Sequence, residues 1–134
     1  MTLPVDFAAL RIVLIDDDAF FRATLRQQLI RLGCTQIIEA GDGAQGLAEC
    51  ARIQPDLILC DISMEPMNGL DFVSALRRTE WAGAAVAPVM FITGHSGIDT
   101  VRQAARVGGA AFLVKPILLR TLKEKIESLL AKSA

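Results

Sequence analysis

The 134-residue sequence lacks the features that mark several other classes of protein. It has three cysteines, Cys34, Cys50 and Cys60, an odd number without CxxC spacing, which argues against a disulfide framework and against a zinc site. We expect these cysteines to be buried free thiols. No apolar run approaches the roughly 20 residues that span a bilayer, and the N-terminus does not have the pattern of a signal peptide. We therefore expect a cytoplasmic protein that does not cross a membrane.

The sequence also lacks an excess of charge of either sign. Fourteen basic and fifteen acidic residues give a formal charge of −1, and no basic stripe is present that would bind a polynucleotide, so we expect no nucleic-acid partner. Repeats and low-complexity segments are absent. With 52% hydrophobic and 22% charged residues, the composition is that of a folded globular protein. The length predicts one domain over residues 1–134, with a core at about residues 10–131 and no output domain.

Five short runs rich in Val, Ile and Leu alternate with segments of helical periodicity. The predicted strands are residues 10–15, 35–39, 57–60, 88–92 and 111–114. The first, third and fourth runs are apolar at nearly every position, which is typical of parallel strands covered on both faces. Five strands alternating with five helices predict an α/β doubly wound sheet with helices on both sides.

Helix boundaries are indicated by capping residues and apolar spacing. Asp18 precedes apolar residues repeating every three or four positions from Phe21 to Leu32, and Gly33 follows at the C′ position. A similar pattern follows Pro116. The other predicted helices are residues 44–53, 69–78 and 97–107, the last with Ser96 as its N-cap.

Polar residues gather where the predicted strands end, which is where ligands bind in such a sheet. These residues are Asp16, Asp17 and Asp18 after the first strand, Asp61 after the third, Thr93 after the fourth, and Lys115 with Pro116 after the fifth. Each has an ordinary explanation when taken singly, as a helix cap, a turn hydroxyl or a solvated lysine. Their joint placement indicates a site.

The residue types at these strand ends suggest phosphoryl transfer. Converging carboxylates repel one another, so a cation is needed, and Mg²⁺ commonly bridges carboxylates to a phosphate. With Mg²⁺ and the Lys115 ammonium neutralising the group, a carboxylate can attack phosphorus and form an acyl phosphate. Thr93 and Lys115 are suited to holding phosphoryl oxygens.

The segments IVLIDDD, LILCDISMEPMNGLDF, VMFITGH and AFLVKP resemble those of two-component response-regulator receiver domains, in the same order and over almost the whole chain. The resemblance implies a flavodoxin-like (βα)5 fold with strand order 2-1-3-4-5. It implies that Asp61 is the phosphoacceptor and that Asp16, Asp17, Asp61 and the backbone carbonyl of Ser63 hold Mg²⁺. It further implies that Thr93 is the switch hydroxyl, with Lys115 as the salt-bridge partner of the phosphoryl group and a cis Lys115–Pro116 bond.

The resemblance also implies a switching face on the fourth helix, fifth strand and fifth helix. The residues expected around it are Ile98, Val101, Arg102, Arg106, Phe112 as the switch aromatic, and Leu118. We expect Val101 to pack in the core, whereas core packing and partner contact are equally compatible with the sequence for Phe112 and Leu118. A weak dimer through this face and a monomer are both compatible with the pattern.

Three segments depart from the usual family pattern. The proline of the Glu65–Pro66 pair is shifted by one residue, Gly94 stands where Ala or Ser is usual, and the segment 81–88 is longer and richer in alanine. His95 and Ser63 are candidates for tuning dephosphorylation, with an ordinary loop histidine as an equal alternative for His95.

The implied function is a phosphoacceptor switch, which is not an enzyme beyond catalysing its own phosphorylation and dephosphorylation. Its expected partners are a sensor histidine kinase or a histidine phosphotransfer protein, and an unknown downstream protein. The downstream role is either docking on a target or carrying the phosphoryl group in a phosphorelay. Partner choice in the family depends on a first-helix surface, here including Phe20, Ala23, Thr24 and Gln27.

Other classes fit the sequence less well. A phosphorylation-independent interaction domain is the main alternative, although such receivers usually lack an acid, the threonine or the lysine. A haloacid dehalogenase-type phosphohydrolase usually has a longer core and a cap. The three consecutive aspartates would repel the phosphate of a flavin carrier.

Overall fold

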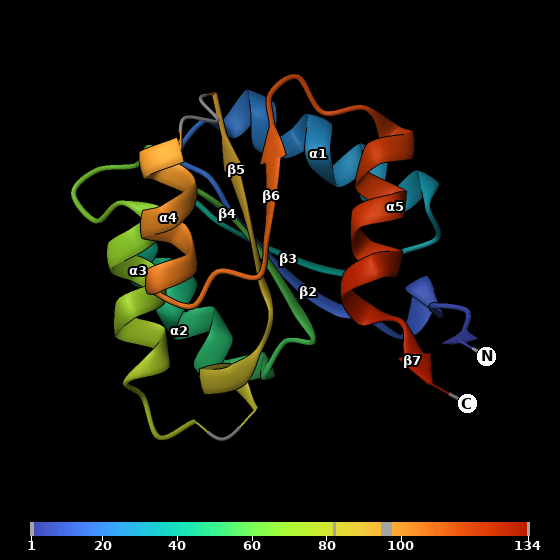
Figure 1. Cartoon of the computed structure of the whole chain (residues 1–134), viewed down its shortest axis with the longest axis horizontal. Coiled ribbons are helices and arrows are strands. Elements are labelled where there is room, and N and C mark those ends of the chain that lie inside the picture. The colour runs from blue at the N-terminus through green and yellow to red at the C-terminus, as the bar shows by residue number, and fades with distance from the viewer. Residues whose placement is uncertain (1, 82, 95–97, 134) are drawn as a thin grey trace.

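The computed structural model describes residues 2–81, 83–94 and 98–133. Its centre is a five-stranded parallel sheet in the order β3-β2-β4-β5-β6 (Figure 1). The strands are β2 (Arg11–Ile15), β3 (Gln36–Ala40), β4 (Leu57–Asp61), β5 (Val89–Thr93) and β6 (Ala111–Val114). The predicted order, in which the second strand is at one edge and the first lies beside the third, is confirmed.

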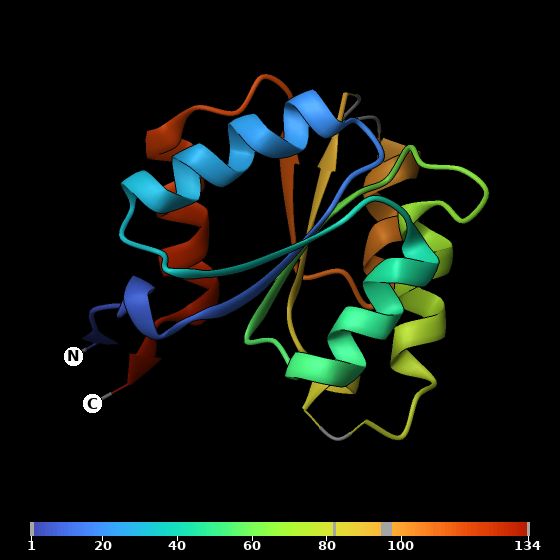
Figure 2. The same ribbon diagram turned by 180° about the vertical axis from the view of Figure 1, so that it is seen from behind.

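Helices cover both faces of this sheet, as Figures 1 and 2 show from opposite sides. One face is covered by α1 (Ala19–Arg31) and α5 (Leu119–Leu130), and the other by α2 (Gly43–Ile53), α3 (Gly69–Arg77) and α4 (Ile98–Arg106). The two faces form separate apolar clusters, because alternate strand residues point to opposite sides. Every residue of β4 and β5 is buried, which confirms that these strands are covered on both faces.

The first long helix begins and ends where its capping residues predict. The Asp18 side chain accepts hydrogen bonds from the amides of Phe20 (3.0 Å) and Phe21 (3.1 Å), so it caps the N-terminus of α1. Gly33 follows the helix with φ +108°, a backbone conformation that favours glycine. The predicted strand and helix boundaries agree with the structure to within one or two residues, except that Ser96, the expected cap of α4, lies outside the described residues.

Four short elements were not predicted from the sequence. They are β1 (Thr2–Leu3), which pairs antiparallel with β7 (Lys132–Ser133), and the 3-10 helices η1 (Phe7–Ala9) and η2 (Ala84–Val86). Elements of two or three residues are too short for periodicity to reveal. The β1–β7 pair lies outside the predicted core of residues 10–131 and brings the two ends of the chain side by side (Figure 1).

The three cysteines have the environment that the sequence predicts. Cys34, Cys50 and Cys60 are free and buried, and burial raises the pKa of the Cys34 thiol to about 11 and that of Cys50 to about 12. Within the described part of the chain, no helix has the length and apolar character needed to span a bilayer.

Candidate functional site

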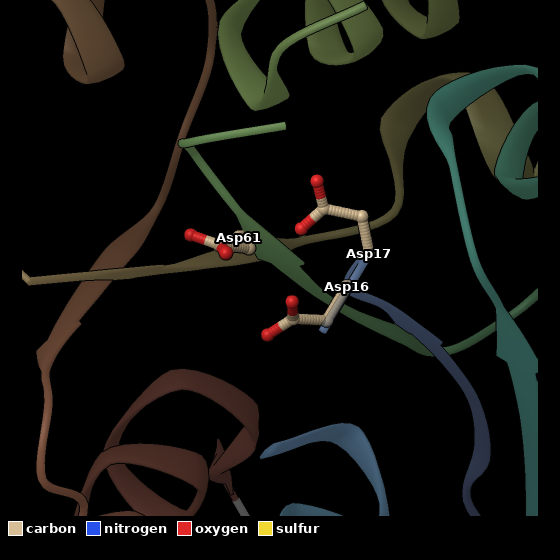
Figure 3. Close-up of side chains that lie close together, drawn as sticks. All are labelled: Asp16, Asp17 and Asp61. Carbon is tan, nitrogen blue, oxygen red and sulfur yellow. The ribbon is translucent and has the colours of Figure 1, made fainter. Parts of the chain in front are cut away.

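Three aspartates meet at the carboxyl-terminal edge of the sheet. Asp61 ends β4 and Asp16 follows β2, and these two strands are neighbours with Ile15 paired to Cys60. One carboxylate oxygen from each of Asp16, Asp17 and Asp61 lies within 4.8 Å of the others (Figure 3). Asp16 and Asp61 are buried whereas Asp17 is exposed. The cluster therefore has a buried floor and an open side.

Lys115 brings a positive charge to this cluster from the end of β6. Its Nζ lies 3.3 Å from Oδ2 of Asp61 and 3.7 Å from Oδ2 of Asp16. The Lys115 amide donates to the carbonyl oxygen of Thr93 at 2.8 Å, which ties the ends of β5 and β6 together and places the buried Thr93 beside the lysine. The Lys115–Pro116 and Glu65–Pro66 peptide bonds are cis, the first as expected from the family resemblance.

Burial destabilises the charged form of the Asp16 carboxyl group. Desolvation raises its carboxyl pKa from 3.8 to about 6, and the negative charge of Asp61 adds to this rise. The Asp18 amide, which donates to Oδ1 of Asp16 at 2.8 Å, and the Lys115 ammonium both oppose it. Oδ2 of Asp16 accepts no hydrogen bond from any residue that the structure describes.

These residues fit a hard divalent cation such as Mg²⁺. The ligands that Mg²⁺ prefers are oxygen atoms such as those of carboxylates, and Oδ2 of Asp16 is a buried oxygen inside a group of three carboxylates that accepts no hydrogen bond from the described part of the chain. The Lys115 ammonium supplies one positive charge to a cluster of three acidic side chains. A divalent cation held by Asp16, Asp17 and Asp61 would supply the charge that the cluster lacks.

The backbone around Asp61 is shaped by two local contacts. The Ser63 amide donates to Oδ1 of Asp61 at 3.1 Å, which leaves Oδ2 for Lys115. Gly69, the first residue of α3, lies so close to the strand end that a Cβ added there would overlap the Asp61 carbonyl oxygen. The sequence motif contains Gly69, but its role as the close-packed start of α3 depends on the folded structure.

The residues expected around the switch are partly placed by the structure. Phe112 is half-buried, with its ring centroid 6.1 Å from that of Phe91, and Arg102, Arg106 and Leu118 are exposed. The expectation that Val101 packs in the core is wrong, since this side chain is 41% exposed. Among the α4 side chains that the structure describes, Ala104, which is 2% exposed, is the one that packs in the core, so apolar spacing alone does not determine which side chain of this helix is covered. His95 and the side chain of Ile98 lie outside the described residues.

The expected first-helix surface is exposed. Phe20 is 83% exposed although it is a large apolar side chain, and Ala23, Thr24 and Gln27 are also exposed on α1. Its neighbour Phe21 has a contact that the sequence did not reveal, because its ring lies 4.1 Å from Nζ of Lys115.

Comparison with known proteins identifies the family. The sequence model of the response regulator receiver domain family matches residues 12–127 of this chain. The chain therefore belongs to this family, whose members are signalling switches. The chemotaxis protein CheY of Pseudomonas aeruginosa is 32% identical over 120 residues, covering 90% of this chain and 95% of that protein. The crystal structure of Vibrio cholerae CheY4 matches with a TM-score of 0.83 and 26% identity, covering 90% of this chain and 98% of that one.

Longer regulators are also similar to this chain. The transcriptional regulatory protein PdtaR of Mycobacterium tuberculosis is 33% identical over 117 residues. The match covers 87% of this chain and 55% of PdtaR, so this chain spans about half the length of that relative.

Proposed function

We propose that this protein receives a phosphoryl group on Asp61 from a phosphohistidine donor in the presence of Mg²⁺ and thereby controls a partner protein. The observation that carries the proposal is the pairing of the buried Asp61 carboxylate with Lys115 Nζ at 3.3 Å, inside a cluster of three carboxylates. A structural ion pair would not need two further acids beside it, one of which is buried and accepts no hydrogen bond on Oδ2 from the residues that the structure describes.

The transfer requires a carboxylate held in one orientation. A carboxylate oxygen of Asp61 attacks phosphorus, the bond between phosphorus and the donor imidazole nitrogen breaks, and that nitrogen leaves with the bonding electron pair and takes up a proton. The Ser63 amide and the Lys115 ammonium fix the two oxygens of the Asp61 carboxylate before the reaction. Mg²⁺, held by Asp16, Asp17, Asp61 and the Ser63 carbonyl, would neutralise the approaching phosphoryl oxygens.

After transfer, Thr93 and Lys115 provide the contacts that distinguish the phosphorylated form. A phosphoryl group shifts the population toward a conformation only if it interacts better with that conformation. The Thr93 hydroxyl can donate to a phosphoryl oxygen while the Lys115 ammonium pairs with another, and both residues continue directly into the switching face. That face comprises α4, β6 and α5, and its residues Phe112, Arg102 and Leu118 change their exposure to a partner when the conformation shifts.

Two classes of partner follow from this proposal. A sensor histidine kinase or histidine phosphotransfer protein approaches over the exposed α1 surface beside the acidic cluster, where Phe20 is 83% exposed. A downstream protein docks on the switching face, and the likeness to CheY over 95% of that protein's length supports docking rather than a phosphorelay. Ser63 and His95 are proposed to influence how fast water hydrolyses the acyl phosphate.

The proposal is tested by intact-mass spectrometry after mixing the protein with acetyl phosphate and Mg²⁺. We expect one added phosphoryl group, which is lost with EDTA and in Asp61→Asn. Asp71→Asn is the matched control, because Asp71 is an exposed aspartate on α3 and should leave the adduct unchanged. An equal adduct in Asp61→Asn, or none in the unaltered protein, would refute the proposal, and the second result would favour a phosphorylation-independent interaction domain.

A further inference from the structure

The ammonium of Lys115 is contacted by an aromatic ring as well as by carboxylates. Its Nζ lies 4.1 Å from the ring centroid of Phe21, while it remains 3.3 Å from Oδ2 of Asp61. A cation within about 6 Å of an aromatic centroid is attracted by the negative face of the ring. The Lys115 side chain is 27% exposed, so the contact is partly shielded from water, which strengthens it relative to an exposed pair.

The position of α1 explains why Phe21 reaches this lysine. The helix begins at the same edge of the sheet at which β6 ends (Figures 1 and 2), and the Asp18 cap accepts a hydrogen bond from the Phe21 amide at 3.1 Å. Two turns later, Nε2 of Gln28 donates to the carbonyl oxygen of Ile117 at 2.7 Å, two residues beyond Lys115. One face of α1 therefore contacts both the lysine side chain and the loop that follows it.

We infer that Phe21 is a positioning residue that holds the Lys115 ammonium against the Asp61 carboxylate. Lysine has a long, flexible side chain, and its ammonium is strongly hydrated, so without further contacts it can leave the Asp61 carboxylate for water. The ring of Phe21 covers one side of the ammonium and leaves it directed toward the two buried carboxylates. The consequence for phosphoryl transfer rests on the proposed function of Asp61, whereas the positioning of Lys115 does not.

Three variants separate this role from ordinary packing. Phe21→Leu keeps an apolar side chain but removes the ring, and Phe21→Tyr keeps the ring. Phe7→Leu is the matched control, because Phe7 packs against the same apolar cluster as Phe21 but lies beside Gly33, beyond the opposite end of α1. Loss of aromatic packing alone should therefore affect Phe21→Leu and Phe7→Leu alike.

The first readout is the NMR chemical shift of the Lys115 ε-methylene protons in the protein without Mg²⁺ or phosphodonor. Protons above a ring face are shifted upfield, so we expect an upfield position in the unaltered protein, in Phe21→Tyr and in Phe7→Leu. We expect Phe21→Leu to move these protons to the position of an ordinary lysine. An unchanged shift in Phe21→Leu would overturn the inference, whatever the protein does with phosphoryl donors.

The second readout is the initial rate of phosphorylation by acetyl phosphate, which needs no protein partner. We expect Phe21→Leu to be slower by about fivefold, the change in rate that corresponds to losing a partly exposed cation–π contact. Phe21→Tyr should restore the rate, and Phe7→Leu should leave it unchanged. Equal slowing in Phe7→Leu and Phe21→Leu, or no recovery in Phe21→Tyr, would overturn the inference. Failure of the unaltered protein to take up a phosphoryl group would instead refute the proposed function.

Discussion

Replacing Asp16 by asparagine is expected to stabilise the metal-free protein at neutral pH. The carboxyl group is buried at the end of β2, where it faces Asp61 from β4 and Lys115 from β6, with Asp17 beside it. The Arg22 guanidinium from α1 donates a hydrogen bond to the backbone carbonyl oxygen of Asp16. Asparagine keeps an acceptor for the Asp18 amide, which donates to Oδ1 of Asp16, and removes the buried charge.

The magnitude follows from the pKa of Asp16, which rises from 3.8 to about 6 on folding. Below pH 3.8 the carboxyl group is protonated in both states and costs nothing. Between pH 3.8 and about pH 6 the unfolded chain releases a proton that the folded protein retains, so the free energy of unfolding falls as the pH rises. Above pH 6 the whole cost is present, and a rise of about two pKa units corresponds to about 3 kcal/mol.

Urea unfolding in EDTA at pH 4, 5, 6 and 7.5 measures this difference. We expect Asp16→Asn to be more stable than the unaltered protein by about 3 kcal/mol at pH 7.5, with the difference shrinking toward zero near pH 4. Glu80→Gln, which removes a charge from an exposed residue, should show no such trend. A variant that is less stable at pH 7.5, or a difference independent of pH, would refute this reasoning.

Three further substitutions test other parts of the structure. Gly69→Ala should destabilise the fold by about 1–3 kcal/mol in urea, because the new methyl group overlaps the Asp61 carbonyl oxygen. Arg77→Met should cost about 3 kcal/mol, because Arg77 donates to three carbonyl oxygens at 2.7–3.1 Å, whereas Arg78→Met at an exposed position should cost much less. Gly94→Ala should be tolerated or stabilising by about 0.5 kcal/mol, since no atom of the described residues, apart from its chain neighbours, lies within 4 Å of the added methyl group. Gly94 follows the buried Thr93 at the end of β5, so the same methyl group should narrow the path of water to the phosphoryl group and lengthen the lifetime of the acyl phosphate, measured by decay of the phosphorylated mass. An unchanged lifetime would show that Gly94 does not control access of water.

The sequence predicts the sheet and the strand-end residues because both depend on strong local signals. Continuous apolar runs identify buried parallel strands, and the alternation with helices brings residues such as Asp16 and Asp61 to one edge of the sheet. Asp18 and Gly33 have capping roles that local backbone geometry determines, so the structure agrees with the sequence at both positions.

The remaining features depend on contacts between distant segments. Helical spacing marks Phe21 as an apolar residue facing inward, but its contact with Lys115 arises only when α1 packs beside the end of β6. Val101 fits an apolar helical position, yet it is exposed, while Ala104 on the same helix is buried in the core. Nothing in the sequence distinguishes Asp16 from Asp17, whereas the structure buries the first and exposes the second.

The central claim, that Asp61 is the residue that receives the phosphoryl group, is tested most directly by trapping the acyl phosphate. Borohydride reduces an aspartyl phosphate to homoserine, and peptide mass spectrometry then locates the altered residue. After treatment with acetyl phosphate and Mg²⁺, we expect homoserine at position 61 and at none of the neighbouring positions 16, 17 and 18. Conversion at another aspartate, or an adduct that survives borohydride unreduced, would contradict the claim.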